Sequence, residues 1–203
     1  FSFCLGLNEL TIPDSVTSID DGAFDHCKGM SCFLTIPNSV TSIGSYAFSN
    51  CGFKGSLIIP DSISSIENGL FKSCIQFSGT LSIPDSVNSI GDQAFFDCFG
   101  FSGNLNLPSS VTFIGSSAFK NCSGFSGSLV IPELNAINPE SFAYCSGLTG
   151  SLDIPNSVKS IGYSAFLNCS GFGGFLTIPN SVQSIGFRAF LNCSKFTGSL
   201  TIP

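Results

Sequence analysis

A hydrophobic motif recurs along the whole chain at intervals of 23 or 24 residues. The repeating unit reads Leu-x-Ile-Pro-Asp/Asn-Ser-Val-x-x-Ile-Gly-x-x-Ala-Phe-x-x-Cys-x-x-Phe-x-Gly-x. A unit of this length cannot bury its own apolar side chains, whereas stacked units share one continuous core. The pattern therefore predicts a solenoid of about eight coils that forms one domain over residues 1–203. The coils begin near Leu10, Leu34, Leu57, Leu81, Leu105, Leu129, Leu152, Leu176 and Leu200.

The spacing inside a unit predicts its local structure. Leu-x-Ile alternates with a period of two, which indicates a short strand with the middle residue pointing outward, and the following Pro ends that strand. Successive strands would form a parallel ladder on the concave face of a right-handed solenoid. Ala-Phe-x-x-Cys has helical spacing over one turn only, so we expect short 3₁₀ turns and loops on the convex face. The Gly after the second Ile, as at Gly44, predicts a left-handed backbone there.

Nine of the ten cysteines are predicted to be reduced. These nine occupy one position of the unit, so neighbours would lie about 4.8 Å apart with parallel Cβ vectors, which does not suit a disulfide. We interpret them as buried thiols that pack like small hydrophobic side chains. Cys32 stands where later units have Gly. It is either a surface thiol that bridges to a neighbouring chain or to Cys27, or neutral variation of the repeat.

Composition narrows the function classes. Charged residues make up 10% of the chain, against about 25% in an ordinary soluble domain, and the net charge is -6. An acidic chain does not suit nucleic-acid binding, and no apolar run has the length of a transmembrane segment. We expect no enzyme, no metal and no cofactor. The single His26 cannot serve a repeating column of Ser, and with Asp21 and Asp25 it is better explained as a solvated acidic turn than as a metal site.

Residues that break the regular pattern are the candidate contact sites. On the outward positions of the Leu-x-Ile strands, small polar residues are interrupted by Phe33, Ile58, Val130 and Phe175. They are candidate contacts for an extended partner, although scattered exposed apolar side chains are also normal on protein surfaces. A second group of extra apolar residues falls near the convex turns and would pack against another chain. Its members are Phe96, Phe99, Tyr163, Leu167, Phe187 and Leu191.

Three Asn-Cys-Ser sequons occur, at Asn121, Asn168 and Asn192. In a eukaryotic secretory protein each would be a candidate N-glycosylation site. The alternative is that the repeat itself created them, because the buried Cys fixes the middle position of each sequon.

The segment from Ile178 to Cys193 resembles the BspA-type (treponemal) leucine-rich repeat, and the resemblance extends over essentially the whole chain. The units here carry one residue more than most units of that family, near a Gly such as Gly127 or Gly198. The resemblance implies a leucine-rich-repeat solenoid. It also implies a surface or secreted protein that adheres to host or matrix proteins or to neighbouring cells.

Three functions stay open from the sequence. The first is a non-enzymatic protein-interaction or adhesion module at the cell surface or outside the cell. The second is a structural component of an extracellular filament or matrix that assembles by end-to-end or lateral packing. The chain begins inside a Phe-x-x-Cys turn and stops inside the strand Leu200–Pro203, so we expect part of a longer repeat protein or a unit that stacks. The third is a binder of ice or a glycan lattice through the Ser, Thr and Asn columns.

Overall fold

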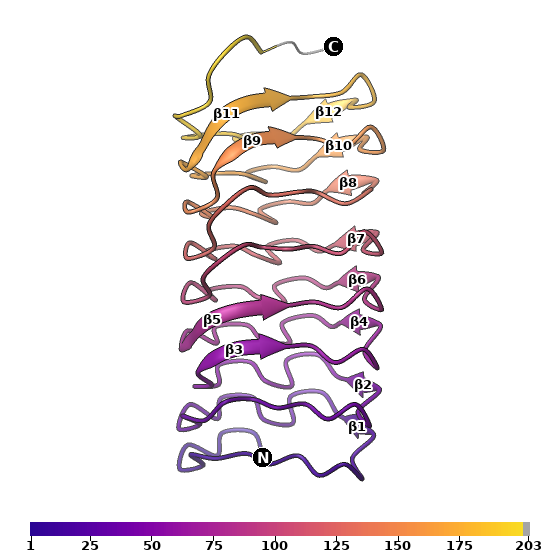
Figure 1. Cartoon of the computed structure of the whole chain (residues 1–203), viewed down its shortest axis with the longest axis vertical. Coiled ribbons are helices and arrows are strands. Elements are labelled where there is room, and N and C mark those ends of the chain that lie inside the picture. The colour runs from indigo at the N-terminus through magenta and orange to yellow at the C-terminus, as the bar shows by residue number, and fades with distance from the viewer. Residues whose placement is uncertain (201–203) are drawn as a thin grey trace.

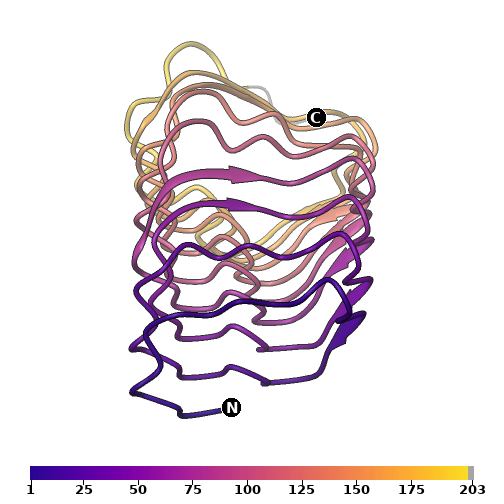
Figure 2. The same ribbon diagram turned by 60° about the horizontal axis from the view of Figure 1, so that its bottom comes forward.

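In a computed structural model that describes residues 1–200, successive repeats wind into one elongated solenoid (Figure 1). The chain crosses the near face from left to right while it climbs from the N-terminus to the C-terminus, so the coil is right-handed. Turned by 60°, each repeat is seen as one flattened loop stacked on the previous one (Figure 2). The predicted solenoid is confirmed. The last predicted coil, which starts at Leu200, lies almost entirely outside the described residues.

The Leu-x-Ile strands lie on the near face in Figure 1, where they pair in parallel. Strand β3 (Gly55–Ile58) pairs with β5 (Phe77–Ser82), and β9 (Gly150–Asp153) pairs with β11 (Phe172–Thr177). Outside these pairs, isolated bridges connect described coils of this face, so the predicted ladder is interrupted. Each segment ends at a Pro, which cannot donate a ladder hydrogen bond.

A second set of parallel strands, divided into three separate sheets, runs along another side of the solenoid and was not predicted from the sequence. It consists of two-residue strands that end at the second Ile of each unit, and it recurs in every complete repeat. The strands are β1 (Ser18–Ile19), β2 (Ser42–Ile43), β4 (Ser65–Ile66), β6 (Ser89–Ile90), β7 (Phe113–Ile114), β8 (Ala136–Ile137), β10 (Ser160–Ile161) and β12 (Ser184–Ile185).

The Ala-Phe-x-x-Cys segment forms overlapping β-turns, and the predicted 3₁₀ turn is wrong for the described residues. The N–H groups of Ala94 and Cys98 donate to carbonyl groups three residues earlier in the same coil. The alternate N–H groups, of Gln93, Phe95 and Asp97, donate instead to carbonyl groups of the next coil. Because half of the donors pair between coils, the segment cannot close a continuous 3₁₀ hydrogen-bond pattern.

The Gly after the second Ile serves close packing rather than a left-handed backbone, so that prediction is also wrong. A Cβ added at Gly44 would lie 2.4 Å from the backbone nitrogen of Asp21 in the preceding coil. A Cβ added at Gly115 would lie equally close, 2.4 Å, to the backbone nitrogen of Asp92. The left-handed residue comes two positions later, as at Tyr46, whose φ is 57°. At Gly44 and Gly115, the neighbouring coil therefore approaches too closely for a side chain.

Two columns of Phe rings fill the core. In the first column consecutive rings stack with centroids 5.3–5.7 Å apart and planes within 12° of each other. Its members are Phe1, Phe24, Phe48, Phe71, Phe95, Phe119, Phe142, Phe166 and Phe190. A second set of Phe rings stacks less regularly, with centroids 4.9–6.3 Å apart and an interruption at Leu148. It touches the first column edge-on, as where Phe95 meets Phe101 at 6.3 Å. Such aromatic pairs add about 0.5–1.5 kcal/mol each beyond the burial of their area.

We predict that Phe119→Ala lowers the free energy of unfolding by about 3–5 kcal/mol. The Phe119 ring is fully buried and lies between the rings of Phe95 and Phe142. Urea denaturation measures the effect. The control is Phe113→Ala, because Phe113 is 48% exposed and should change stability by about 0.5 kcal/mol at most. Equal losses in the two variants would contradict the role assigned to the buried column.

Candidate functional site

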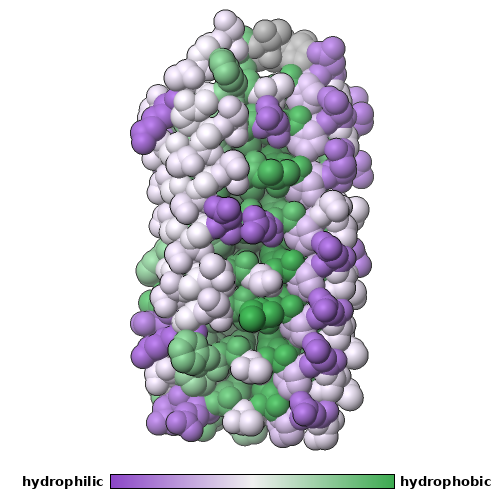
Figure 3. Space-filling model, viewed as in Figure 1, coloured by the Kyte–Doolittle hydropathy of each residue, from purple (hydrophilic) through white to green (hydrophobic). Residues whose placement is uncertain are grey.

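The face that carries the Leu-x-Ile segments has a regular surface of outward side chains. Figure 3 shows a strip of hydrophobic residues along this face, flanked by small polar side chains and by a column of hydrophilic residues at one side. The two outward positions of successive segments hold mainly Ser, Thr and Asn. The four large apolar residues predicted as contacts are exposed exceptions to this pattern.

The structure brings two of these four residues together. Phe33 and Ile58 are 72% and 66% exposed, and both line a cavity of about 330 Å³ whose floor includes Leu34 and Ile36. Val130 and Phe175 are equally exposed but lie in later coils. With about 4.8 Å for each coil, Val130 is about 14 Å from Ile58 along the axis. Only Phe33 and Ile58 therefore form one compact apolar spot.

The two exposed Phe residues of this face also cover backbone. A Cβ added at Gly55 would lie 2.4 Å from the Phe33 ring, and one at Gly198 would lie 2.5 Å from the Phe175 ring. Both glycines have a positive φ, of 74° and 85°. Each ring thus shields an open glycine of the next coil, which is a known way for an aromatic side chain to protect a sheet. One side of each ring is therefore a structural contact, and the other is available to a partner.

Acidic residues collect along this face. They stand at the outward strand positions or directly after the Pro that ends each segment, and all of them are exposed. They are Glu9, Asp14, Asp61, Asp85, Glu133 and Asp153. Among the described residues at these same positions there is no Lys or Arg. These positions therefore carry only negative charge, although the exposed Lys54 lies beside Phe33 on the same face. The acidic positions complement a partner that carries basic groups.

The Cys column forms a ladder of thiol hydrogen bonds through the core. All ten cysteines are free thiols in this structure. The Cys122 thiol donates to the carbonyl oxygen of Phe95 at 3.0 Å, and the same bond recurs from coil to coil. Burial raises the pKa of the Cys145 thiol to about 12 and places the pKa of Cys122 well above its ordinary value. These thiols are structural donors, which explains why Cys rather than Ala recurs there.

Cys32 lies outside the ladder and is partly exposed. Cys27, the partner suggested for an internal disulfide, is buried, and its thiol donates to the carbonyl oxygen of Phe1 at 3.1 Å. Both residues are free thiols in this structure. A bridge from Cys32 to another chain stays a prediction.

The acidic turn around His26 has structural contacts. His26 Nδ1 lies 2.9 Å from Asp25 Oδ1, and the His26 ring stacks on Phe3. Asp21 Oδ1 accepts the N–H of Ser45 in the next coil at 2.6 Å. In the same way, Asn68 Oδ1 accepts the N–H of Asp92, and Asp92 Oδ1 accepts the N–H of Ser116. This column of side-chain acceptors between coils was not predicted from the sequence. Within residues 1–200, no three His, Cys, Asp or Glu side chains are placed to hold a metal ion.

The sequon asparagines occupy left-handed positions. Asn121, Asn168 and Asn192 have φ values of 64°, 58° and 63°. Asn tolerates this conformation better than most residues. Asn121 Nδ2 also donates to Asp97 Oδ1 at 2.6 Å, and Asn192 Nδ2 donates to Asn168 Oδ1 at 2.7 Å. The Asn column thus has a structural reason of its own, and glycosylation stays a prediction.

Comparisons with known proteins agree with this fold. The family model described as a BspA type leucine rich repeat region matches residues 1–126 and 74–197, in 6 copies. No curated protein matches the chain. The chain is 24% identical to the T. pallidum leucine rich repeat protein TpLRR, with a TM-score of 0.63, over 90% of this chain and 72% of that one. This likeness supports a shared fold.

Two other solved structures are more distant in shape. A leucine-rich repeat protein from Bacteroides ovatus is 23% identical, with a TM-score of 0.46, over 96% of this chain and 73% of its own. A leucine rich cell surface protein from Faecalibacterium prausnitzii is 21% identical, with a TM-score of 0.44, over 92% and 78%. Within residues 1–200 of the present chain, no helix has the length and apolar character needed to cross a membrane.

We predict that the protein loses stability steeply above about pH 9. Thiols in the unfolded chain ionise near their ordinary pKa of 9.0, whereas burial raises the pKa of the ladder thiols in the folded chain. The unfolded state then releases protons that the folded state keeps, so stability is complete below pH 9 and falls as the pH rises toward the folded pKa. Each thiol contributes a slope of about 1.4 kcal/mol per pH unit.

Urea unfolding at several pH values between 7 and 10 measures this slope. The variant Cys122→Ala removes one buried thiol and should make the slope shallower by one such contribution. A stability that stays constant between pH 8 and 10 would contradict the predicted linkage.

We also predict that a maleimide modifies Cys32 before the buried ladder thiols from Cys27 to Cys169 in the native protein. The two end thiols of the ladder, Cys4 and Cys193, are partly exposed like Cys32. Cys32 is partly exposed, whereas Cys98 and Cys122 are fully buried and protonated. Only the thiolate reacts, and only where the reagent can reach it. Peptide mass spectrometry after short labelling identifies the modified residues, with Cys32→Ser as the control. Equal labelling of Cys122 under native conditions would show that the ladder is accessible.

Proposed function

Because this chain belongs to the BspA type leucine-rich repeat family, we propose that it is a non-enzymatic protein-interaction module. Its binding surface is the face that carries the Leu-x-Ile segments. We further propose that the module is displayed on a cell surface or secreted, and that it mediates adhesion to a host, matrix or neighbouring-cell protein. This proposal rests on the chemistry of the exposed face and on the family to which the repeats belong.

The observation that carries the proposal is the apolar spot formed by Phe33 and Ile58. Most outward positions of this face hold small polar residues, so two adjacent large side chains that are 72% and 66% exposed stand apart from the repeat. They line a cavity of about 330 Å³ together with Thr35, Asn38 and Ser56. Binding sites commonly consist of a few apolar anchors surrounded by polar groups that exclude water. The spot has this composition.

The partner's chemistry follows from the surroundings of the spot. Asn38 lines the cavity, and the exposed carboxylate of Asp61 follows Pro60, another lining residue. An apolar side chain of the partner would enter the cavity beside Phe33. Basic groups of the partner would meet the acidic residues along the face, which adds speed and selectivity to association more than affinity.

Self-assembly into a structural filament is the second candidate, and one observation favours it. Tyr163 and Phe187 occupy the same position in consecutive coils and are 53% and 72% exposed, and Leu191 nearby is 43% exposed. Such a patch would pack against a second copy. A lattice binder of ice or glycan has less support on the Leu-x-Ile face, because Ile58, Val130 and Asp153 interrupt its small polar column.

We predict that the double variant Phe33→Ser/Ile58→Thr weakens partner binding by about tenfold or more. Both new residues occur at the same positions in other coils, as Ser56 and Thr35, so the fold should persist. The effect is measured as binding to intact cells and, by biolayer interferometry, as binding to immobilised matrix proteins. Val130→Thr is the matched control, because Val130 is exposed but isolated from the spot.

The outcomes separate the two candidates. Saturable binding that the double variant loses and Val130→Thr keeps supports the interaction module. Assembly that grows with protein concentration in sedimentation, without any foreign ligand, supports the structural role instead. Equal binding by the double variant and the unchanged protein would overturn the assignment of Phe33 and Ile58.

A further inference from the structure

A second groove lies away from the Leu-x-Ile face, at the edge where each coil leaves its β-turns. It has a volume of about 570 Å³, which is within the usual range for small-molecule sites. Its lining comes from four successive coils: Asp97, Phe99, Asn121, Ser123, Tyr144, Ser146, Asn168 and Ser170. We propose that this groove binds a neutral oligosaccharide.

The backbone holds the groove rigidly. The wall residues Asp97, Asn121, Tyr144 and Asn168 all have φ between 58° and 64°. Each of them donates its N–H to a carbonyl group of the next coil, at 2.6–2.9 Å. The same conformation in each coil therefore projects these side chains in the same direction. A bound ligand would find most of the site already arranged, which lowers the entropic cost of binding.

The polar groups of the groove match hydroxyl groups. Amide and hydroxyl side chains both donate and accept hydrogen bonds, as sugar hydroxyls do. Asn121 Nδ2 is fixed on Asp97 Oδ1 at 2.6 Å, which leaves the amide oxygen for a ligand. The hydroxyls of Ser123, Ser146 and Ser170 follow one another at intervals of one coil. An entirely apolar ligand would leave these groups without partners, at a cost in free energy.

Two exposed aromatic rings supply the apolar surface of the groove. Phe99 is 49% exposed and Tyr144 is 39% exposed, and they stand two coils apart, about 10 Å along the axis. The face of a sugar ring that carries C–H groups packs well against such an aromatic face, and Tyr adds a hydroxyl at its edge. Two rings at this separation suit a chain of linked sugars better than a single sugar.

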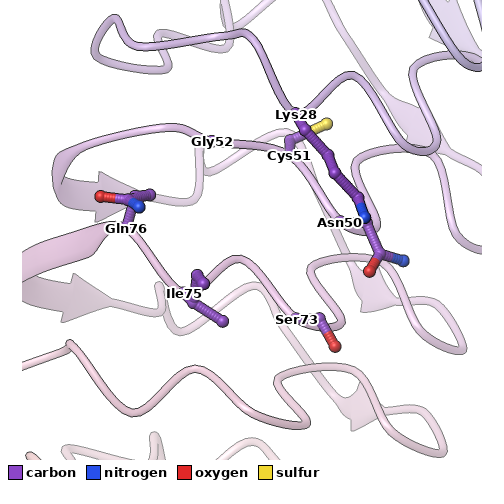
Figure 4. Close-up of a pocket in the computed structure, with 7 residues that line it drawn as sticks. All are labelled: Lys28, Asn50, Cys51, Gly52, Ser73, Ile75 and Gln76. Carbon is purple, nitrogen blue, oxygen red and sulfur yellow. The ribbon is translucent and has the colours of Figure 1, made fainter. Parts of the chain in front are cut away.

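The charge of the groove disfavours acidic ligands. No Lys or Arg lines the groove, and its one ionisable carboxyl group, on Asp97, would repel phosphate, sulfate or an acidic sugar. A smaller cavity of about 220 Å³ on the same edge, in earlier coils, provides a contrast (Figure 4). There Lys28 and Ile75 stand where the larger groove has Ser and Phe, so the lining of the smaller cavity has a basic side chain and no aromatic ring.

The test uses the full chain produced in the bacterial cytoplasm, where the sequons stay unmodified. The probes are chitohexaose, cellohexaose and mannohexaose as neutral chains and a heparin hexasaccharide as an acidic one, each titrated by calorimetry. We expect a neutral probe to bind, and we expect Phe99→Ser and Tyr144→Ser each to weaken it by about tenfold. Ser stands at these positions in other coils, as Ser123 and Ser73, so both variants should fold.

Two controls make the result specific. Phe113→Ser removes an aromatic ring that is 48% exposed in β7 and does not line the groove, and it should leave binding unchanged. Phe33→Ser/Ile58→Thr should also bind the probe normally, which separates this groove from the proposed protein-binding face. Binding of none of the neutral probes, binding of the heparin probe alone, or equal losses in Phe99→Ser and Phe113→Ser would overturn the proposal.

Discussion

The stacking of like side chains one coil apart is the interaction on which the whole molecule depends. Each coil is too short to bury its own apolar residues, so its stability comes from the coils above and below it. The Phe column meets this need with rings 5.3–5.7 Å apart. The Cys column beside it fills the remaining space and donates to the Phe carbonyl groups. A charged residue in either column would face two apolar neighbours, which is why these columns vary so little.

The same stacking decides where function can lie. Because each repeat has nearly the same backbone, any outward position forms a column whose residue is constrained only by its two neighbours along the axis. Small polar residues satisfy that constraint at little cost, so large apolar exceptions need a reason. Phe33 has one structural reason, since it covers Gly55. Ile58 and Phe99 are 66% and 49% exposed, and contact with a ligand is the reason that we propose for them.

The sequence predicted what stacks, but it did not predict how the backbone pairs. Periodicity alone placed Phe119 and Cys122 in the core, and both are fully buried. It misjudged the turn around Phe95, because the split of N–H groups between the turn and the next coil depends on how close the coils are. The Gly44 prediction failed for the same reason, since the limit there is the backbone of Asp21 rather than a local φ. Phe33 and Ile58 could be recognised in the sequence because they break the repeat pattern. The groove at Phe99 and Tyr144 could be recognised only in the structure, because its residues come from four coils.

The sequons connect the two proposed surfaces to the place where the protein is made. Asn121 and Asn168 line the groove at Phe99, whereas the Phe33 and Ile58 cavity contains no sequon. An N-linked glycan on either Asn would fill the groove that we assign to a free oligosaccharide, so modification and ligand binding exclude each other there. The Leu-x-Ile face would be unaffected, because it lies on another side of the coil. Glycosylation of either Asn would therefore block the proposed oligosaccharide groove and leave the proposed protein-binding cavity open.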